Sequence, residues 1–431
     1  MCELFSYLFF ISFAYLTLQA LQIKLLNKST HDHNAHLHLI YDVRKSGWPL
    51  PPRPTAIINP SSWGGNPIFF HYLIGKFPDK FIDTIAWFQA PFFILITSLV
   101  LFATFNEKLD SNILIIIYAL ILFNPSNFDI SNAKNFGFSS RPAGQFLVIC
   151  HLCLMYLLNF NDDLLWFDLL ILLLTVLTGV GAIAMNVFAA QVLIIFSLGS
   201  IFFGNYIPIT FLTLSFIIFF LIFGDYSKKY LFSTIGYWNV NRKHISQAVT
   251  IKGYPSFWIT PFKEIPVALK NRDLKSLFNL LSKNALLNSF FLNPLPWLII
   301  FIYPQYLFSP DLLSLFILSM TAAFFITSIK FGRFWGESNR YLEFSFPFSL
   351  VLGFSLIEDY LLLIAVYLLV INVFQIITSY LLSSHLEEIE SEFLEIENFI
   401  NKNIHSDITL ISNNNSATRF FMKNDWKFLT V

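Results

Sequence analysis

The sequence predicts an all-α polytopic membrane protein with about eleven transmembrane helices. Of its 431 residues, 55% are hydrophobic and 13% are charged, whereas ordinary soluble domains carry about 25% charged residues. The mean hydropathy is +0.62, and the apolar residues are gathered in long runs. The formal net charge is zero, which argues against a nucleic-acid partner because nucleic-acid-binding domains are strongly basic.

The expected spans follow from the requirement of roughly twenty apolar residues per crossing. The first run is read as an uncleaved helix, because no cleavage site of small residues follows it. The run at 111–124 is too short to cross alone. The predicted spans lie near residues 4–24, 84–105, 111–124, 143–160, 164–184, 187–204, 206–224, 288–307, 311–330, 341–357 and 359–383.

Two parts of the chain are distinguished by composition. Residues 1–383 form the predicted transmembrane domain, which includes a first external loop at 25–83 and a long polar loop at 225–287. Residues 384–431 form a short appendage, with apolar residues three and four apart among acids, as in an amphipathic helix. A short strand is expected at 408–411.

The first external loop has a recognisable order of features. It opens on Asp32, a short amphipathic helix is expected at 33–45, and a Gly-Trp-Pro-Leu-Pro run at 47–51 and a Gly-Gly-Asn-Pro run at 64–67 follow. This order resembles the first external loop of GT-C fold glycosyltransferases, such as lipid A aminoarabinose transferases and protein O-mannosyltransferases. The resemblance implies transfer of a sugar from a polyprenyl-phosphate donor to a lipid, glycan or protein acceptor.

Asp32 occupies the position of the acid that serves this superfamily as catalytic base or metal ligand. Transfer of a sugar to a hydroxyl requires a carboxylate that removes the acceptor proton or holds a metal that does so. The alternative is that Asp32 caps the helix, which has an apolar stripe at Leu37, Ile40 and Val43. Asp42 is the second candidate base, although it falls towards the polar side of that helix.

Histidines surround the candidate base. His33 and His36 lie one helical turn apart beside Asp32, and imidazole with carboxylate is suitable ligand chemistry for a divalent metal. The alternative is that they are solvated loop side chains, so no cofactor is certain and a divalent metal stays open. His33 is also a candidate substrate contact. It stands where the related loops often carry a glutamate, and this departure weighs against a paired-acid site.

A second motif lies at residues 332–344, where Gly-Arg-Phe-Trp-Gly-Glu-Ser-Asn-Arg-Tyr precedes a predicted span. It resembles the Arg-Tyr turn that opens a late transmembrane helix in several GT-C families. Arg340 at a helix start suits a phosphate, and Arg333 is a second cation for the same group. Glu337 and Tyr341 are assigned to substrate contacts. The alternative is an interfacial cluster that anchors the helix.

The loop before the span at 143–160 supplies further candidates. Arg141 is predicted to bind the donor phosphate, with an ordinary interfacial arginine as the alternative. The Asn124-Pro125 turn is predicted to place polar groups towards a substrate.

The resulting prediction is an integral membrane glycosyltransferase of a bacterial plasma membrane, with membrane lipids as its surroundings and its active face outside. The excess of basic residues on that face would place it in the cytoplasm by the positive-inside rule, so orientation stays open. A transporter or flippase of a lipid-linked or anionic solute is the first alternative. A polymerase or ligase of lipid-linked glycans, working without an acidic base, is the second.

Overall fold

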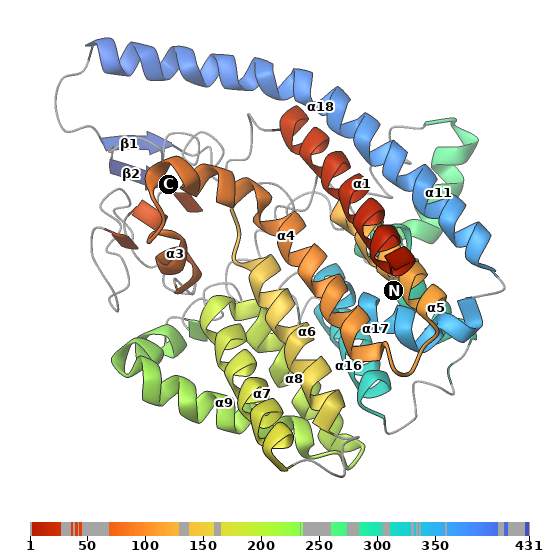
Figure 1. The fold of residues 1–431 in the computed structure, drawn as a ribbon. Helices are drawn as coiled ribbons and strands as arrows, with labels where there is room; N and C mark the ends of the chain where they lie inside the picture. The colour runs from red at the N-terminus through yellow and green to blue at the C-terminus, as the bar shows by residue number, and fades with distance from the viewer. Residues whose placement is uncertain are drawn as a thin grey trace.

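The structure is a computed structural model, and its described residues are almost entirely helical (Figure 1). It describes residues 2–26, 36–37, 39–41, 43–44, 69–128, 138–158, 165–232, 234–235, 260–273, 284–302, 304, 311–328, 332, 335, 338–357, 360–403, 409–412 and 427–430. The helices are α1 (Cys2–Leu26), α3 (Phe69–Ile74), α4 (Asp79–Phe105), α5 (Ser111–Leu122), the 3-10 turn η2 (Pro125–Asn127), α6 (Arg141–Leu158), α7 (Leu165–Met185), α8 (Val187–Phe202), α9 (Ile207–Phe223), α11 (Thr260–Lys270), α13 (Ala285–Leu292), α14 (Pro294–Ile302), α16 (Leu312–Ser328), α17 (Asn339–Ile357) and α18 (Leu361–Asn403).

Four described helices are long and apolar enough to cross a membrane, and a fifth results if α9 and the helix at Asp225–Phe232, bent by 118°, form one broken span. The four are Glu3–Leu25, Thr84–Phe105, Arg141–Leu158 and Trp166–Met185. Helices α5, α8 and α16 have 12, 16 and 17 residues, fewer than the roughly twenty of a typical crossing. The predicted number of about eleven spans is therefore not confirmed in the described part of the chain.

The outer surface agrees with a membrane environment. One side of α1 carries four phenylalanines whose exposed fractions lie between 62% and 66%: Phe5, Phe9, Phe10 and Phe13. A soluble protein rarely exposes such a contiguous apolar face, whereas lipid tails are a favourable neighbour for it. Together with the long apolar helices, this face identifies an integral membrane protein.

Helices α4 and α6 run side by side in the same direction (Figure 1). Ile82 near the start of α4 packs in one cluster with Ala143 near the start of α6. At the other end, Lys108 just beyond α4 donates a hydrogen bond of 3.0 Å to the hydroxyl of Tyr156. The bundle therefore has two distinct ends, called here the starting end and the finishing end of α4 and α6.

Helix α5 returns from the finishing end and stops after 12 residues, followed by the polar turn η2. Amide side chains from two helices hold this turn: Gln19 of α1 donates to the carbonyl of Asn127 at 3.0 Å, and Asn372 of α18 donates to the carbonyl of Phe123 at 2.7 Å. Asn127 itself donates to two carbonyls at the end of α5, at 2.8 and 3.1 Å. Irregular backbone at membrane depth requires such internal partners.

The described part of the first loop packs onto the starting end. Ile40 and Val43 are fully buried, as the apolar stripe predicted. Ile40 lies in one hydrophobic cluster with Phe70 of α3 and with Phe138, which precedes α6. The loop is therefore placed beside the starts of α4 and α6.

The predicted span at 288–307 is divided into α13 and α14. Asn293 separates the two helices, and Pro294 begins the second. Proline disfavours a helical conformation for the residue before it, which explains the break. Trp297 of α14 is 2% exposed, packs against Phe324 of α16 and donates to the hydroxyl of Ser289 at 3.1 Å, so the two short helices are firmly docked.

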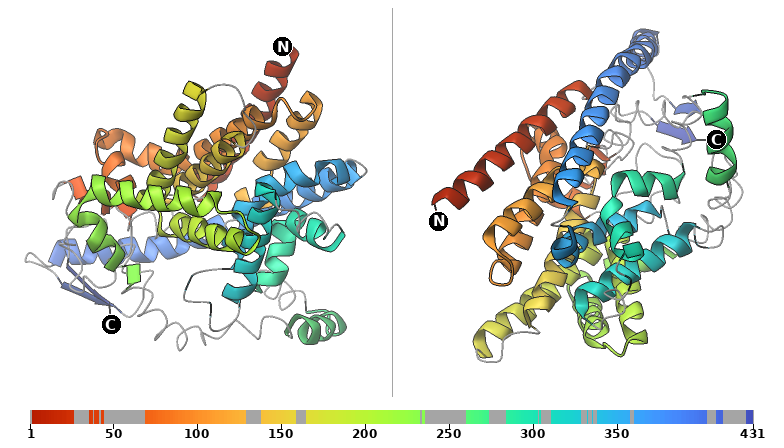
Figure 2. Two further views of the ribbon diagram at one scale, coloured as in Figure 1. Left: turned by 90° about the horizontal axis from the view of Figure 1, so that it is seen from below. Right: turned by 90° about the vertical axis from the view of Figure 1, so that its right-hand side faces the viewer.

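Helix α18 has 43 residues and extends past the rest of the bundle (Figures 1 and 2). It joins the last predicted span and the predicted acidic tail helix, so the predicted boundary between residues 383 and 384 lies inside one helix. The chain then forms a small parallel sheet, in which β1 (Thr409–Ser412) pairs with β2 (Lys427–Thr430). The strand expected at 408–411 is thus present one residue further along.

Candidate functional site

Helices α6 and α8 begin in direct contact. Asn186 caps α8 by accepting hydrogen bonds from two backbone N–H groups at 2.8 and 3.2 Å, and its Nδ2 donates to the hydroxyl of Ser140 at 3.0 Å. Gly144 allows this approach, because a Cβ at that position would lie 2.7 Å from the Cβ of Asn186. Real Cβ atoms essentially never come so close.

Helix α17 begins at the same place. The side chain of Gln145 in α6 donates to the backbone carbonyl of Glu343 at 3.1 Å. The ring of Tyr341 lies 4.7 Å from that of Phe188 in the first turn of α8. The guanidinium of Arg340 lies over the same phenylalanine ring, 5.9 Å from its centre. The starts of α6, α8 and α17 therefore form one site, called here the helix-start cluster (Ser140, Arg141, Asn186, Phe188 and Arg340).

Two of the predicted phosphate ligands belong to this cluster. Arg141 is the first residue of α6 and Arg340 the second of α17, and both are half-buried. A cation at a helix N-terminus opposes the helix dipole, which costs about 0.3–1 kcal/mol unless an anion is also present. The N–H groups of the first turn and the guanidinium would both favour such an anion.

Tyr341 has a mainly structural environment. It is fully buried, and its hydroxyl donates to the carbonyl of Trp335 at 3.3 Å. This contact folds the segment before α17 back onto the helix. Its assignment to a substrate contact stays a prediction.

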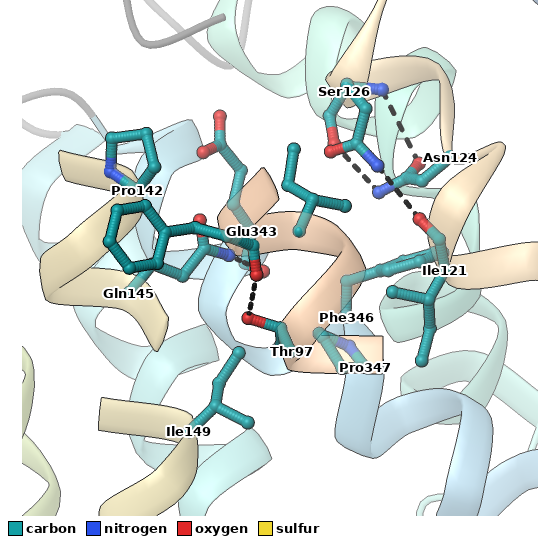
Figure 3. Close-up of a pocket in the computed structure, with 13 residues that line it drawn as sticks. Thr97, Ile121, Asn124, Ser126, Pro142, Gln145, Ile149, Glu343, Phe346 and Pro347 are labelled. Carbon is teal, nitrogen blue, oxygen red and sulfur yellow. Dashed lines mark hydrogen bonds between the residues drawn. The ribbon is translucent and has the colours of Figure 1, made fainter. Parts of the chain in front are cut away.

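A pocket with polar and apolar lining residues, called here the polar pocket, adjoins the helix-start cluster along α6 and α17, and Figure 3 shows the residues that line it. Its volume is about 30 Å³, room for about two water molecules. Residues of four helices and the η2 turn line it: Phe93, Ile94 and Thr97 of α4, Ile121 of α5, Asn124, Ser126 and Asn127, Pro142, Gln145 and Ile149 of α6, and Glu343, Phe346 and Pro347 of α17. The Asn124-Pro125 turn, expected to face a substrate, thus contributes to this pocket.

Glu343 is the only carboxylate that lines the pocket in the described residues. It is 6% exposed, and Figure 3 shows its carboxylate extending past Pro142 on the side of the pocket away from Thr97. Ionisable side chains within membrane helices are costly and mark functional sites. The sequence reasoning gave this residue no role, although a lone acid inside an apolar run was a sufficient signal.

The polar turn is braced from outside the pocket. The Nδ2 of Asn124 donates to the hydroxyl of Ser126 at 2.7 Å and to the side-chain oxygen of Asn293, between α13 and α14, at 3.0 Å. The turn is therefore fixed to a helix pair that is 169 residues distant in the chain. Such bracing gives the pocket a defined shape.

His36 and His71 form a close pair beside the start of α6. The Nδ1 of His36 lies 2.9 Å from the Nε2 of His71, and the two rings are stacked. Both pack against Phe138. Within the described residues, no three His, Cys, Asp or Glu side chains are placed to hold a metal ion. Two imidazoles are fewer than the three or four protein ligands of zinc sites.

The other predicted site residues lie outside the described residues. They are the two candidate bases Asp32 and Asp42, the candidate metal and substrate ligand His33, the second phosphate ligand Arg333, and the substrate contact Glu337. Of the predicted set, the structure brings Arg141, Arg340 and Tyr341 to one end of the bundle and places His36 in the loop packed there.

Comparison with known proteins gives a likeness in structure. No protein-family model matches the sequence, and no curated protein matches it. The fold is similar to a crystal structure of the oligosaccharyltransferase of Archaeoglobus fulgidus in complex with Zn and sulfate, with a TM-score of 0.56 and 14% identity. The likeness covers 96% of this chain and 62% of that one. The chain therefore shares the GT-C fold of that oligosaccharyltransferase.

Proposed function

We propose that this chain is an integral membrane glycosyltransferase. It transfers a sugar from a polyprenyl-phosphate donor to a lipid, glycan or protein acceptor, with Asp32 as the base and Arg340 on the donor phosphate. The observation that carries the proposal is the helix-start cluster, in a chain that has the fold of an oligosaccharyltransferase. The proposed setting is a bacterial plasma membrane with the active face outside.

The donor phosphate is supported by the electrostatics of the cluster. Arg141 and Arg340 each stand at a helix N-terminus, where the helix dipole favours an anion. Phosphate oxygens accept hydrogen bonds from guanidinium and backbone N–H groups alike. The polyprenyl tail would lie along the apolar outer faces of the helices.

The base is supported by the loop from which it comes. The helix that follows Asp32 in the sequence packs through Ile40 onto Phe70 and Phe138. Phe138 precedes Arg141 by three residues. An acid at the beginning of this loop is therefore proposed to act beside the cluster. It would remove the acceptor proton while the phosphate leaves with the electrons of the broken sugar–oxygen bond.

A divalent metal is not built into the proposal. The oligosaccharyltransferase similar in fold was crystallised with Zn, but the described residues of this chain offer only the pair His36 and His71. Two imidazoles are fewer than the three or four protein ligands of a zinc site, so the proposed transfer uses a carboxylate base and no metal.

A transporter or flippase of a lipid-linked or anionic solute is the second candidate. Its support is α5, which stops part-way and ends in the polar η2 turn beside a pocket. Transporters often bind substrates at such interrupted helices. The cationic groups, however, gather at the helix starts, which favours chemistry at the membrane surface.

The deciding experiment is sugar transfer in membranes that contain matched amounts of wild type, Asp32→Asn or Asp42→Asn, supplied with labelled polyprenyl-phosphate sugars. Transfer by the wild type that is lost in Asp32→Asn and kept in Asp42→Asn is the expected result. Transfer unaffected by Asp32→Asn would exclude that residue as the base and favour the polymerase or ligase alternative. No transfer from any donor, with movement of the labelled lipid across vesicles, would favour the flippase.

A further inference from the structure

We propose that the polar pocket recognises hydroxyl groups on one edge of the donor sugar, with Glu343 as the carboxylate that accepts their hydrogen bonds. The inference rests on the proposed function, because it names a sugar-reading subsite for the same donor. It assigns a role to the η2 turn and to Glu343, neither of which the transfer step itself requires.

The chemistry of the lining is that of a hydrogen-bond acceptor site. The Nδ2 groups of Asn124 and Asn127 donate to partners within the protein. The hydroxyl of Thr97 donates to the carbonyl of Phe93 at 2.7 Å. The polar part of the lining therefore consists mainly of side-chain oxygens, including the carboxylate of Glu343, and the natural partners of such oxygens are donors such as sugar hydroxyls.

The size of the pocket restricts what can enter. A volume of about 30 Å³ holds about two water molecules and is too small for a whole sugar ring. Two hydroxyls on a ring edge can replace two waters and reproduce their hydrogen bonds. The ring itself would remain at the mouth, near the helix-start cluster.

The spacing along α17 links the pocket to the phosphate. Arg340 and Glu343 are three residues apart, so they share a face of the helix and differ in height by about 4.5 Å. This separation is comparable with that between the phosphorus of a sugar phosphate and the ring hydroxyls. A donor held at Arg340 would therefore present its sugar edge at the level of Glu343.

Two other buried polar side chains of α17 do not line the pocket. The hydroxyls of Ser345 and Ser349 are fully buried, but each donates to a carbonyl of its own helix, at 3.1 and 2.9 Å. Their hydrogen bonds are local. Glu343 differs because its side chain lines a cavity that is shared by four other elements, α4, α5, η2 and α6.

The test uses the purified full chain in lipid nanodiscs, a polyprenyl-phosphate sugar that the wild type accepts, and the set of its singly deoxygenated analogues. Glu343→Gln should lower kcat/KM for the parent donor about 10- to 100-fold, as expected for loss of a charged hydrogen bond. With one deoxy donor, which already lacks the recognised hydroxyl, the variant should differ from wild type by no more than about threefold. Glu343→Asp should restore part of the loss.

Glu107→Gln is the matched control, because this exposed acid lies beyond the finishing end of α4; it should transfer like wild type. Thr97→Val, nearly identical in shape, gives a second route if Glu343→Gln does not fold, and should show a smaller loss with the same dependence on the deoxy donor. Equal activity of wild type and Glu343→Gln, or an equal loss on the parent and on every deoxy donor, would overturn the inference. A wild type that uses no donor would instead overturn the proposed function itself.

Discussion

The two ends of α4 and α6 each carry a cation over an aromatic ring, and their settings differ. At the finishing end, Lys108 lies 4.3 Å from the ring centre of Tyr156, beside helix C-termini whose dipoles favour a cation. At the starting end, Arg340 lies over Phe188 at a helix N-terminus, where the dipole opposes it. The first contact agrees with an anchor of the helix ends, whereas the second lies where a helix dipole favours an anion.

The residues around Lys108 and Arg340 also differ. Lys108 is exposed, and its ammonium contacts the ring and the hydroxyl of Tyr156. Arg340 stands one turn from the buried Glu343 and above a pocket lined by amides and hydroxyls. A cation near an aromatic ring is thus weak support for a ligand-binding site by itself. Polar groups that converge from several helices distinguish a binding site from an anchor.

The largest expected effect comes from replacing each of the two cations, Arg340 and Lys108, in turn. Arg340→Ala should lower kcat/KM for sugar transfer about 100-fold or more, because it would remove the charge-assisted hydrogen bonds proposed to hold the donor phosphate. Lys108→Ala should change it less than about twofold. Arg340→Lys should fall between, since a lysine keeps the charge and loses the two-pronged geometry.

The measurement is transfer kinetics in nanodiscs at equal amounts of folded protein. Equal losses in Arg340→Ala and Lys108→Ala would mean that both cations act as anchors. The contrast between the two ends would then have no functional meaning.

A smaller effect is expected from the contact between α6 and α8. Gly144→Ala brings a Cβ to within 2.7 Å of Asn186 and 3.1 Å of Ala189, where neither neighbour can move without shifting a helix. The unfolding free energy should fall by about 1–3 kcal/mol, and transfer should fall with it because the helix starts separate. Thermal unfolding in detergent and transfer kinetics would show both changes.

Gly181→Ala is the control for this prediction. The Cβ would meet the end of the Leu147 side chain at 3.1 Å, which can rotate away. Alanine also favours helix by up to about 1 kcal/mol over glycine. This variant should be as stable as wild type or more so; a loss as large as that of Gly144→Ala would show that helix packing in general, and not the helix-start cluster, is sensitive.

The sequence predicted the helices well where apolar runs are separated by polar residues. The predicted spans at 187–204 and 206–224 correspond closely to α8 and α9, because Asn186 caps the first and Gly204, with φ of 75°, ends the turn between them. The division at Asn293-Pro294 was missed, although proline was the signal. The continuous α18 was missed because its composition changes from apolar to acidic while its helical backbone does not.

The candidate site was predicted in part. Arg340 and the Asn124-Pro125 turn were selected from local motifs, and both belong to the arrangement at the starting end. Their relation to each other was not predictable, since Asn124 meets Asn293 across 169 residues. Pairings of that kind depend on how the helices pack. No local sequence pattern indicates which distant side chain will accept a hydrogen bond from a given amide.

The smallest expected effect concerns the η2 turn. Asn127→Leu keeps the side-chain volume but removes the hydrogen bonds to the carbonyls of Ile121 and Leu122. Hydrogen bonds inside membrane proteins average about 0.6 kcal/mol, so the unfolding free energy should fall by about 1 kcal/mol. Thr178→Ala, which removes a hydroxyl bonded to carbonyls of its own helix, should cost less than half of that.

The informative readout for Asn127→Leu is selectivity rather than stability. If the turn shapes a subsite, the variant should lose discrimination between the parent donor and the deoxy donor that separates Glu343→Gln from wild type, while Thr178→Ala keeps it. Unchanged discrimination, with the expected fall in stability, would show that the turn only closes the end of α5. Donor binding at the starting end would then depend on Arg141 and Arg340 at the helix starts, and the amide side chains of the η2 turn would only stabilise the packing of the helices.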